Sequence, residues 1–152
     1  MITQPSTARI LRVIQQELRD NVLPMVTDPQ ALANLQMIEH ILGTLAVRAD
    51  HEIAWMIEEI DALDAVGEQV VAQEPGATKV AAALDESRWA PVTSYHYDDV
   101  ASRYSLASEI LSCALEAVPG DVPLRATLEA LLDARLDHEV DIMGEFQLVG
   151  RT

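Results

Sequence analysis

The segment SYHYDDV, residues 94–100, contains the side chains of this chain best suited to chemistry on a bound molecule. Aromatic residues make up only 4% of the sequence, yet one tryptophan and all three tyrosines fall within sixteen positions, with a histidine among them. A histidine beside aromatic rings could act as an acid or base in a small-molecule pocket. The candidate ligand-binding residues are therefore Trp89, Tyr95, His96, Tyr97 and Tyr104.

The same residues have a second interpretation, as part of a hydrophobic core. Tyr97 and Tyr104 lie seven residues apart and Leu111 continues the series, so a helix would place all three on its apolar face. Tyrosines at such positions reach a hydrogen-bond partner with the hydroxyl at the rim of the core. Trp89 precedes Pro91 in a predicted linker, where its ring either covers one end of the fold or lines a pocket. Both interpretations stay open at this point.

The histidine spacing does not predict a metal site. A carboxylate-bridged metal centre in a helical bundle uses two Glu-x-x-His motifs. None of the four histidines has a glutamate three residues earlier. The nearest substitute is the set His138, Asp141 and Glu145, which would share one helical face, but a chain with 25 acidic residues produces such spacings by coincidence. We therefore expect no metal and no cofactor.

The sequence also lacks a recognisable nucleophile or phosphate-binding loop. Cys113 is the only cysteine and lies in a predicted helix, where a thiol needs a neighbouring base to react. The six glycines are isolated, so no glycine-rich loop is available to bind a phosphate. We assign no residue a catalytic role, and the sequence leaves open whether the protein is an enzyme.

Two stripes of charge form the other patterned feature. Five carboxylates step by four along the predicted last helix, and each neighbouring like-charge pair destabilises a helix by about 0.2–0.5 kcal/mol. A basic stripe on the first helix would offset them inside the fold or across a dimer contact. A solvated face and a basic protein partner are the alternatives. The candidate interaction residues are Arg9, Arg12, Arg19, Glu129, Asp133, Asp137, Asp141 and Glu145.

Hydrophobic periodicity predicts helices in the first half of the chain. The first helix is expected to begin at Ser6 or Thr7, which are good N-cap residues, and to end at Pro24. Asp28 caps a second helix, whose apolar residues repeat every seven positions to about residue 72. Unbroken, this helix would be about 65 Å long. We therefore expect either a second subunit against its far end or a bend at a glycine, Gly43 or Gly67.

The second half reads as three more helices, separated by breaks rich in proline and glycine. A short amphipathic helix covers residues 77–89, a longer one opens at Thr93 or Ser94, and the last begins at Asp121 with Pro123 in its first turn. Short turns favour antiparallel neighbours. The predicted fold is all-α, an antiparallel helical bundle of four main helices plus one short helix, in a single domain over residues 1–152.

Composition excludes several classes of partner. The formal net charge is −15 and Lys79 is the only lysine, whereas nucleic acids and anionic membranes both require clustered cations. A single cysteine suits a reducing cytosol. No apolar run approaches the ~20 residues of a membrane span, and the N-terminus lacks a signal-peptide pattern. We expect a cytoplasmic protein that contacts neither nucleic acid nor membrane.

The first half of the chain carries a family resemblance. Its helix RILRVIQQELRDNVLPMV is followed by the longer helix ALANLQMIEHILGTLAVRAD. Over residues 8–60, with Pro24 as the most specific residue, this resembles a family of small bacterial all-helical proteins of unknown function. Their genes often neighbour kinases of the aminoglycoside-phosphotransferase type and acyl-CoA dehydrogenases. The resemblance carries over no catalytic residues. It implies a cytosolic accessory protein that works with a kinase-like enzyme.

Two functional hypotheses follow from the sequence. The first is a non-enzymatic accessory or regulatory protein that acts through protein–protein contacts, by self-association or with another protein. It rests on the missing catalytic motif, the long second helix and the charge stripes. The alternative is a helical bundle that binds or transforms a small molecule in a pocket near Trp89 and Tyr95–Tyr97.

Overall fold

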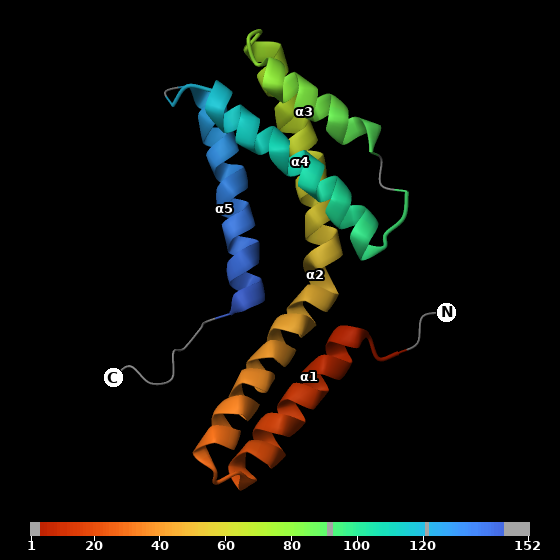
Figure 1. Ribbon diagram of the computed structural model, residues 1–152, viewed down its shortest axis with the longest axis vertical. Coiled ribbons are helices and arrows are strands. Elements are labelled where there is room, and N and C mark those ends of the chain that lie inside the picture. The colour runs from red at the N-terminus through yellow and green to blue at the C-terminus, as the bar shows by residue number, and fades with distance from the viewer. Residues whose placement is uncertain (1–3, 91–92, 121, 145–152) are drawn as a thin grey trace. The chain divides into compact units, whose positions relative to one another are not determined.

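The computed structural model describes residues 4–90, 93–120 and 122–144, and within these ranges it is helical with no strand (Figure 1). The prediction of an all-α fold is confirmed. None of the described helices is both long enough and apolar enough to cross a membrane. The elements in chain order are α1 (Thr7–Glu17), a π-helical turn (Leu18–Val22), a 3-10 turn (Leu23–Met25), α2 (Pro29–Gln73), α3 (Thr78–Trp89), α4 (Tyr97–Ala117) and α5 (Pro123–Met143).

The chain folds into two compact units. The first, here called the hairpin unit, comprises Met1–Glu52 and Glu139–Thr152, and the second, the central unit, comprises Ile53–His138. Helix α2 belongs to both, because it runs through the boundary without interruption. Each unit is described by itself below. A single domain over residues 1–152 stays a prediction.

The first two helices begin where the capping residues predicted. Ser6 accepts a hydrogen bond from the backbone N–H of Arg9 and is the N-cap of α1. Asp28 accepts one from the backbone N–H of Ala31 at 2.8 Å, directly before α2. Pro24 lies in the 3-10 turn that follows the π-helical turn, since its ring removes a backbone donor and cannot continue a regular helix.

In the hairpin unit, α1 and α2 run in opposite directions. The Gln15 amide donates to the Glu39 side chain at 2.8 Å, Arg19 pairs with the same carboxylate, and Arg12 pairs with Asp50 at 2.7 Å. Earlier residues of α1 therefore meet later residues of α2. The two helices bury little apolar surface between them: the only buried residues in the described part of this unit are Ala8 and Ala46.

The hydrophobic core lies in the central unit. Four helices contribute to it, and α3 and α4 pack directly against each other. The stripe predicted along α5 is buried only in its first part: Leu124 and Leu128 are buried, whereas Leu136 is 61% exposed. The largest fully buried aliphatic side chains are Leu63, Val66, Val70, Val80, Val100, Ile110 and Leu128.

Helix α2 continues through both of its glycines, and at each of them another element comes close. A Cβ at Gly67 would lie 2.8 Å from Ile110 Cγ2 and 3.3 Å from Leu84 Cδ1. A Cβ at Gly43 would lie 2.8 Å from Gln15 Nε2, the end of a flexible side chain. The absence of a side chain at Gly67 therefore lets α3 and α4 approach α2.

Gly67→Ala is expected to destabilise the central unit, although alanine favours a helix by about 1 kcal/mol over glycine. The added methyl must displace Ile110, which is fully buried, and overpacking of this kind costs about 1–3 kcal/mol. Urea unfolding followed by far-UV circular dichroism measures the change. Gly43→Ala is the control: Gln15 can move aside there, so helix propensity should dominate. A Gly67→Ala variant as stable as the parent would contradict the close packing.

Candidate functional site

A buried arginine joins three helices of the central unit. Arg103 of α4 is only 6% exposed. Its guanidinium donates to Asp64 Oδ2 of α2 at 2.6 Å and to the Ser87 hydroxyl of α3. The Ser87 hydroxyl in turn donates to Asp64 Oδ1 at 3.1 Å. An arginine side chain keeps its charge in proteins, so Asp64 is the counter-ion that its burial requires.

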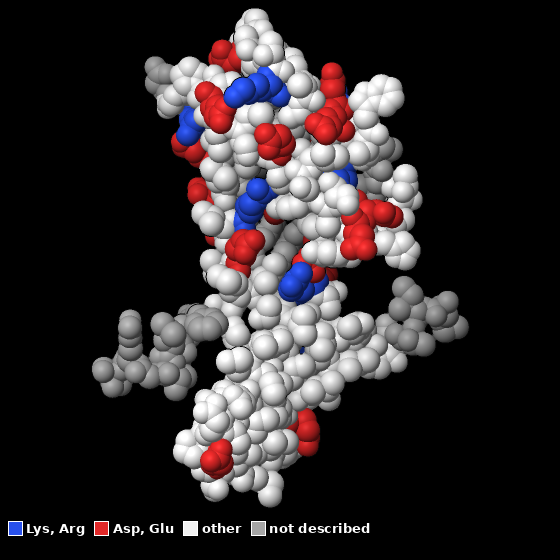
Figure 2. Space-filling model, viewed as in Figure 1, with Lys and Arg blue, Asp and Glu red and all other residues white. Residues whose placement is uncertain are grey.

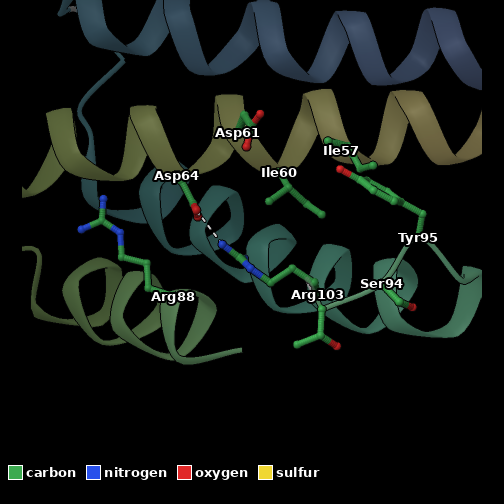
Figure 3. A pocket seen from close by; sticks show the side chains of 9 residues that line it. Ile57, Ile60, Asp61, Asp64, Arg88, Ser94, Tyr95 and Arg103 are labelled. Carbon is green, nitrogen blue, oxygen red and sulfur yellow. Dashed lines mark hydrogen bonds and ion pairs between the residues drawn. The ribbon is translucent and has the colours of Figure 1, made fainter. Parts of the chain in front are cut away.

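Beside this ion pair the central unit contains a cavity of about 540 Å³, a size typical of small-molecule sites (Figure 3). Tyr95, from the segment that leads into α4, lies beside Ile57 of α2. The walls combine aliphatic, hydroxyl and charged side chains. The lining residues are Ile57, Ile60, Asp61, Asp64, Arg88, Thr93, Ser94, Tyr95 and Arg103.

The cavity carries one unbalanced negative charge. Arg103 is neutralised by Asp64, and Arg88 is paired with Glu68. Asp61 is exposed on α2 and has no cationic partner among the described residues. A carboxylate beside an aromatic ring suits a small cation, because both attract positive charge.

The structure separates the five ligand-binding candidates. Tyr95 lines the cavity and is 78% exposed. Trp89 is the last residue of α3 and is 85% exposed, while Tyr97 is the first residue of α4 and is 49% exposed. His96 is exposed at the N-cap of α4. Tyr104 lies in a different cluster, so the aromatic segment does not form one site.

The predicted start of α4 was wrong by two to three residues. Its N-cap is His96, not Thr93 or Ser94. The Ser94 hydroxyl instead accepts the backbone N–H of His96 at 3.1 Å and donates to Asp99. Ser94 therefore orders the turn before the helix, which is a second common use of a serine near a helix start. Asp121, the predicted start of the last helix, and Pro91 lie outside the described residues.

A second polar cluster surrounds Glu59 on α2. Its carboxylate accepts the Tyr104 hydroxyl at 2.6 Å and Arg135 Nε at 3.0 Å, and lies 2.8 Å from His138 Nδ1. Arg135 lies over the Tyr104 ring, 4.9 Å from its centroid. The His138 ring stacks on Trp55 with centroids 4.4 Å apart. The cluster therefore ties α4 and α5 to α2.

The cluster shifts the acid–base equilibria of its members. Burial alone would raise the pKa of Glu59, but the hydrogen bonds from Tyr104, His138 and Arg135 outweigh burial and lower that pKa below its ordinary value of 4.5. Burial, followed by the hydrogen bond to Glu59, raises the pKa of the Tyr104 hydroxyl. Glu59 is thus held as a carboxylate and Tyr104 as a neutral donor.

The Glu59 cluster has no room for a substrate. The cavity next to it, lined by Glu59, Leu63 and Arg135 among others, measures about 10 Å³, scarcely the space of one water molecule. Its polar groups are engaged with one another. The arrangement therefore fits a structural cluster, which is one of the two interpretations that the sequence left open for Tyr104.

Cys113 is poorly suited to nucleophilic chemistry. The residue is 8% exposed, and its sulfur lies 3.7 Å from the Glu109 carboxylate. Burial, and then the negative charge of Glu109, raises the pKa of the thiol above its ordinary value. No group of three or more histidine, cysteine, aspartate or glutamate residues in the described ranges has the geometry to hold a metal ion.

Three described residues of the charge stripes form ion pairs, and each pair lies within one unit. Arg12 and Arg19 pair with α2, as described above, and Arg9 donates its backbone N–H to Ser6. Glu129 pairs with Arg125 one turn earlier on α5. Asp133, Asp137 and Asp141 are exposed. Glu145 lies outside the described residues.

The exposed apolar side chains concentrate on the hairpin unit. Of the sixteen large hydrophobic residues exposed in the described chain, nine lie between Ile10 and Leu45. Figure 2 shows few charged side chains on the visible surface of this hairpin. Five of the nine form what we call the hairpin face, each 41–48% exposed: Ile10, Ile14, Ile38, Ile41 and Leu45.

Helical geometry turns part of each half of this face to the same side. On α1, Ile14 lies about a third of a turn, and Ile10 about half a turn, from the residues that contact α2. On α2, Ile38 and Leu45 lie about a third of a turn, and Ile41 about half a turn, from the contact at Glu39 and Gly43. Since the helices run in opposite directions, Ile14, Ile38 and Leu45 point to one side of the hairpin, and Ile10 and Ile41 lie at the outer margins of the face.

Comparison with known proteins adds no relative. No protein-family model matches the chain, and neither a curated protein nor a solved structure matches it. The functional argument therefore depends on the residues described above.

The stabilising effect of Glu59 is expected to depend on pH. Because its folded-state pKa is lowered, the ionised group contributes stability above pH 4.5, and the contribution is lost as the pH falls through the folded-state value. Glu59→Gln should therefore cost roughly 2 kcal/mol at pH 7 and progressively less below pH 4.5. Urea unfolding over a pH series measures this. Glu58→Gln, at an exposed neighbour, is the control, and a gap that stays constant with pH would contradict the assignment.

Proposed function

We propose that the protein is a cytosolic accessory or regulatory protein that acts by binding another protein chain through the hairpin face. One observation carries the proposal: the described part of the hairpin unit buries only Ala8 and Ala46, while five aliphatic side chains of its two helices remain about half exposed. Contiguous apolar surface of this kind marks interaction sites in soluble proteins.

The energetics support a partner on this face. Helices in proteins gain most of their stability from packing of an apolar face, and two buried alanines supply little of it. Full burial of one aliphatic side chain contributes about 1.5–3 kcal/mol. Five half-exposed side chains thus leave several kcal/mol to be gained when a partner covers them.

A non-enzymatic role is supported by the surroundings of Cys113 and of Glu59. The Cys113 thiol is buried with a raised pKa, and the Glu59 cluster has no space for a substrate. The family resemblance of residues 8–60 implies a kinase-like enzyme as the larger partner. That identity remains a prediction, since no match bears on it.

The proposal is tested with a photocrosslinking amino acid placed at position 41 in the protein's own cells. We expect crosslinks to a protein chain, of the same or a different kind, because Ile41 is a half-exposed member of the α2 part of the face. The control is position 71, where Val71 is also exposed on α2 but lies outside the hairpin unit. Absence of protein crosslinks at position 41, or equal crosslinking at both positions, would reject the proposal.

A second candidate function is binding of a small cationic molecule in the 540 Å³ cavity. The observation that favours it is the unbalanced carboxylate of Asp61 in a lining that also contains Tyr95 and the aliphatic side chains of Ile57 and Ile60. A primary amine with an apolar chain matches these groups. This candidate deepens the sequence-based alternative, which placed a pocket near Trp89 and Tyr95–Tyr97.

Isothermal titration calorimetry with hexylamine and with hexanoate distinguishes this candidate. The amine should bind and the carboxylate should not, because only the amine complements Asp61. Asp61→Asn should weaken amine binding about tenfold, a loss typical of a removed charged hydrogen bond. Asp98→Asn, at an exposed carboxylate that does not line this cavity, is the control. Equal binding of both compounds, or of neither, would remove the candidate.

A further inference from the structure

We infer that the hairpin face binds a second copy of this chain, so that two hairpins form a symmetric four-helix bundle. The inference rests on the proposed function and names the occupant of the face. It is argued from the distribution of charge, from the chemistry of the face and from the number of helices that each copy supplies.

The charge of the chain is distributed unevenly. Residues 53–138 hold 16 carboxylates against five lysine and arginine residues, whereas residues 1–52 hold six carboxylates against four arginines, and residues 139–152, the rest of the hairpin unit, hold three carboxylates against one arginine. Two acidic surfaces repel each other, so two copies of this chain can meet at low electrostatic cost only where the charge is nearly balanced. The hairpin is that region.

Three arginines of the hairpin are already paired within one copy. Arg12 and Arg19 are neutralised by Asp50 and Glu39 on the side between the helices. Arg48, which follows Leu45 by one turn, pairs with Glu52. The face thus offers an occupant mainly aliphatic side chains, and the exposed Glu17, one turn after Ile14, is the charge beside it that has no ion pair among the described residues.

This chemistry selects the kind of partner. A basic partner would be attracted to residues 53–138, where the negative charge lies, and not to a balanced apolar face. The matching surface is uncharged, aliphatic and helical. The hairpin face of a second copy has these properties, and a twofold axis would let the same patch serve both sides of the contact.

The geometry matches a common architecture. Each copy supplies two helices in opposite directions, with apolar residues spaced by three and four along each. Two such hairpins placed face to face make a four-helix bundle, to whose core Ile14, Ile38 and Leu45 of both copies would contribute, with Ile10 and Ile41 at its margins. Partly buried leucines of the same helices, such as Leu11 and Leu42, border the face and would extend that core.

The test is the molar mass of the purified full chain by size-exclusion chromatography with light scattering over a concentration series. We expect twice the chain mass of 16.7 kDa. Ile14→Glu and Ile41→Glu should each raise the dimer dissociation constant at least tenfold. Val71→Glu is the matched control, because it adds the same charge at an exposed valine outside the hairpin unit and should leave the dimer intact.

Each other outcome counts against the inference. A monomer at 100 µM overturns it, and so does a dimer that both face variants leave unchanged. If the parent is a monomer but removal of residues 145–152 produces a dimer, the occupant is the chain's own C-terminal segment. If a monomer still gives crosslinks from position 41 to a different protein, the proposed function stands and this inference fails. Far-UV circular dichroism establishes that the variants remain helical.

Discussion

The guanidinium of Arg103 must be neutralised where it is buried, and Asp64 of α2 neutralises it. Because the two groups lie on different helices, their pairing fixes how far α2 is displaced along α4. The same register brings Gly67 against Ile110, seven residues after Arg103, and Glu59 against the Tyr104 hydroxyl. Packing and hydrogen bonding in the central unit therefore depend on one another. A shift in the register of α2 would leave the buried charge of Arg103 without its counter-ion. It would also move Gly67 away from Ile110, where only a glycine allows the close approach.

The hairpin unit follows a different design. Polar contacts made by Gln15, Arg12 and Arg19 hold α1 against α2 along one line, and the helices approach closely at Gly43. Few large side chains are needed for that contact, so the aliphatic residues lie on the adjacent side and stay half exposed. Polar contacts thus fix how α1 lies against α2, although the hairpin has no hydrophobic core of its own. We interpret the apolar side as the place where the missing core is completed by another chain.

The sequence predicted part of the candidate site. Tyr95 could be found because aromatic residues are scarce and cluster around it. Asp64 and Glu59 could not, since their partners are 39 and 45 positions away and a lone carboxylate in an acidic chain carries no signal. Arg103 had a recognisable signal, a cation inside the apolar stripe between Val100 and Ala107. Spacing along one helix cannot say which helix lies beside it, and Arg12 and Arg19 pair with α2 and not with the acidic residues of α5.

By itself, the sequence determined the all-α class and the caps at Ser6 and Asp28, because these depend on backbone preferences and on the periodicity of nearby residues. Whether α2 bends at Gly43 or Gly67 was left open by the sequence, and the structure shows that it runs through both without interruption. Only the tertiary structure decided which apolar positions are buried. Leu128 and Leu136 follow the same pattern on α5, yet the first is buried and the second is 61% exposed. Ile14 on α1 and Ile41 on α2 also belong to apolar patterns, and the tertiary structure leaves both about half exposed. Burial requires a neighbouring element at the right distance, and periodicity contains no information about that distance.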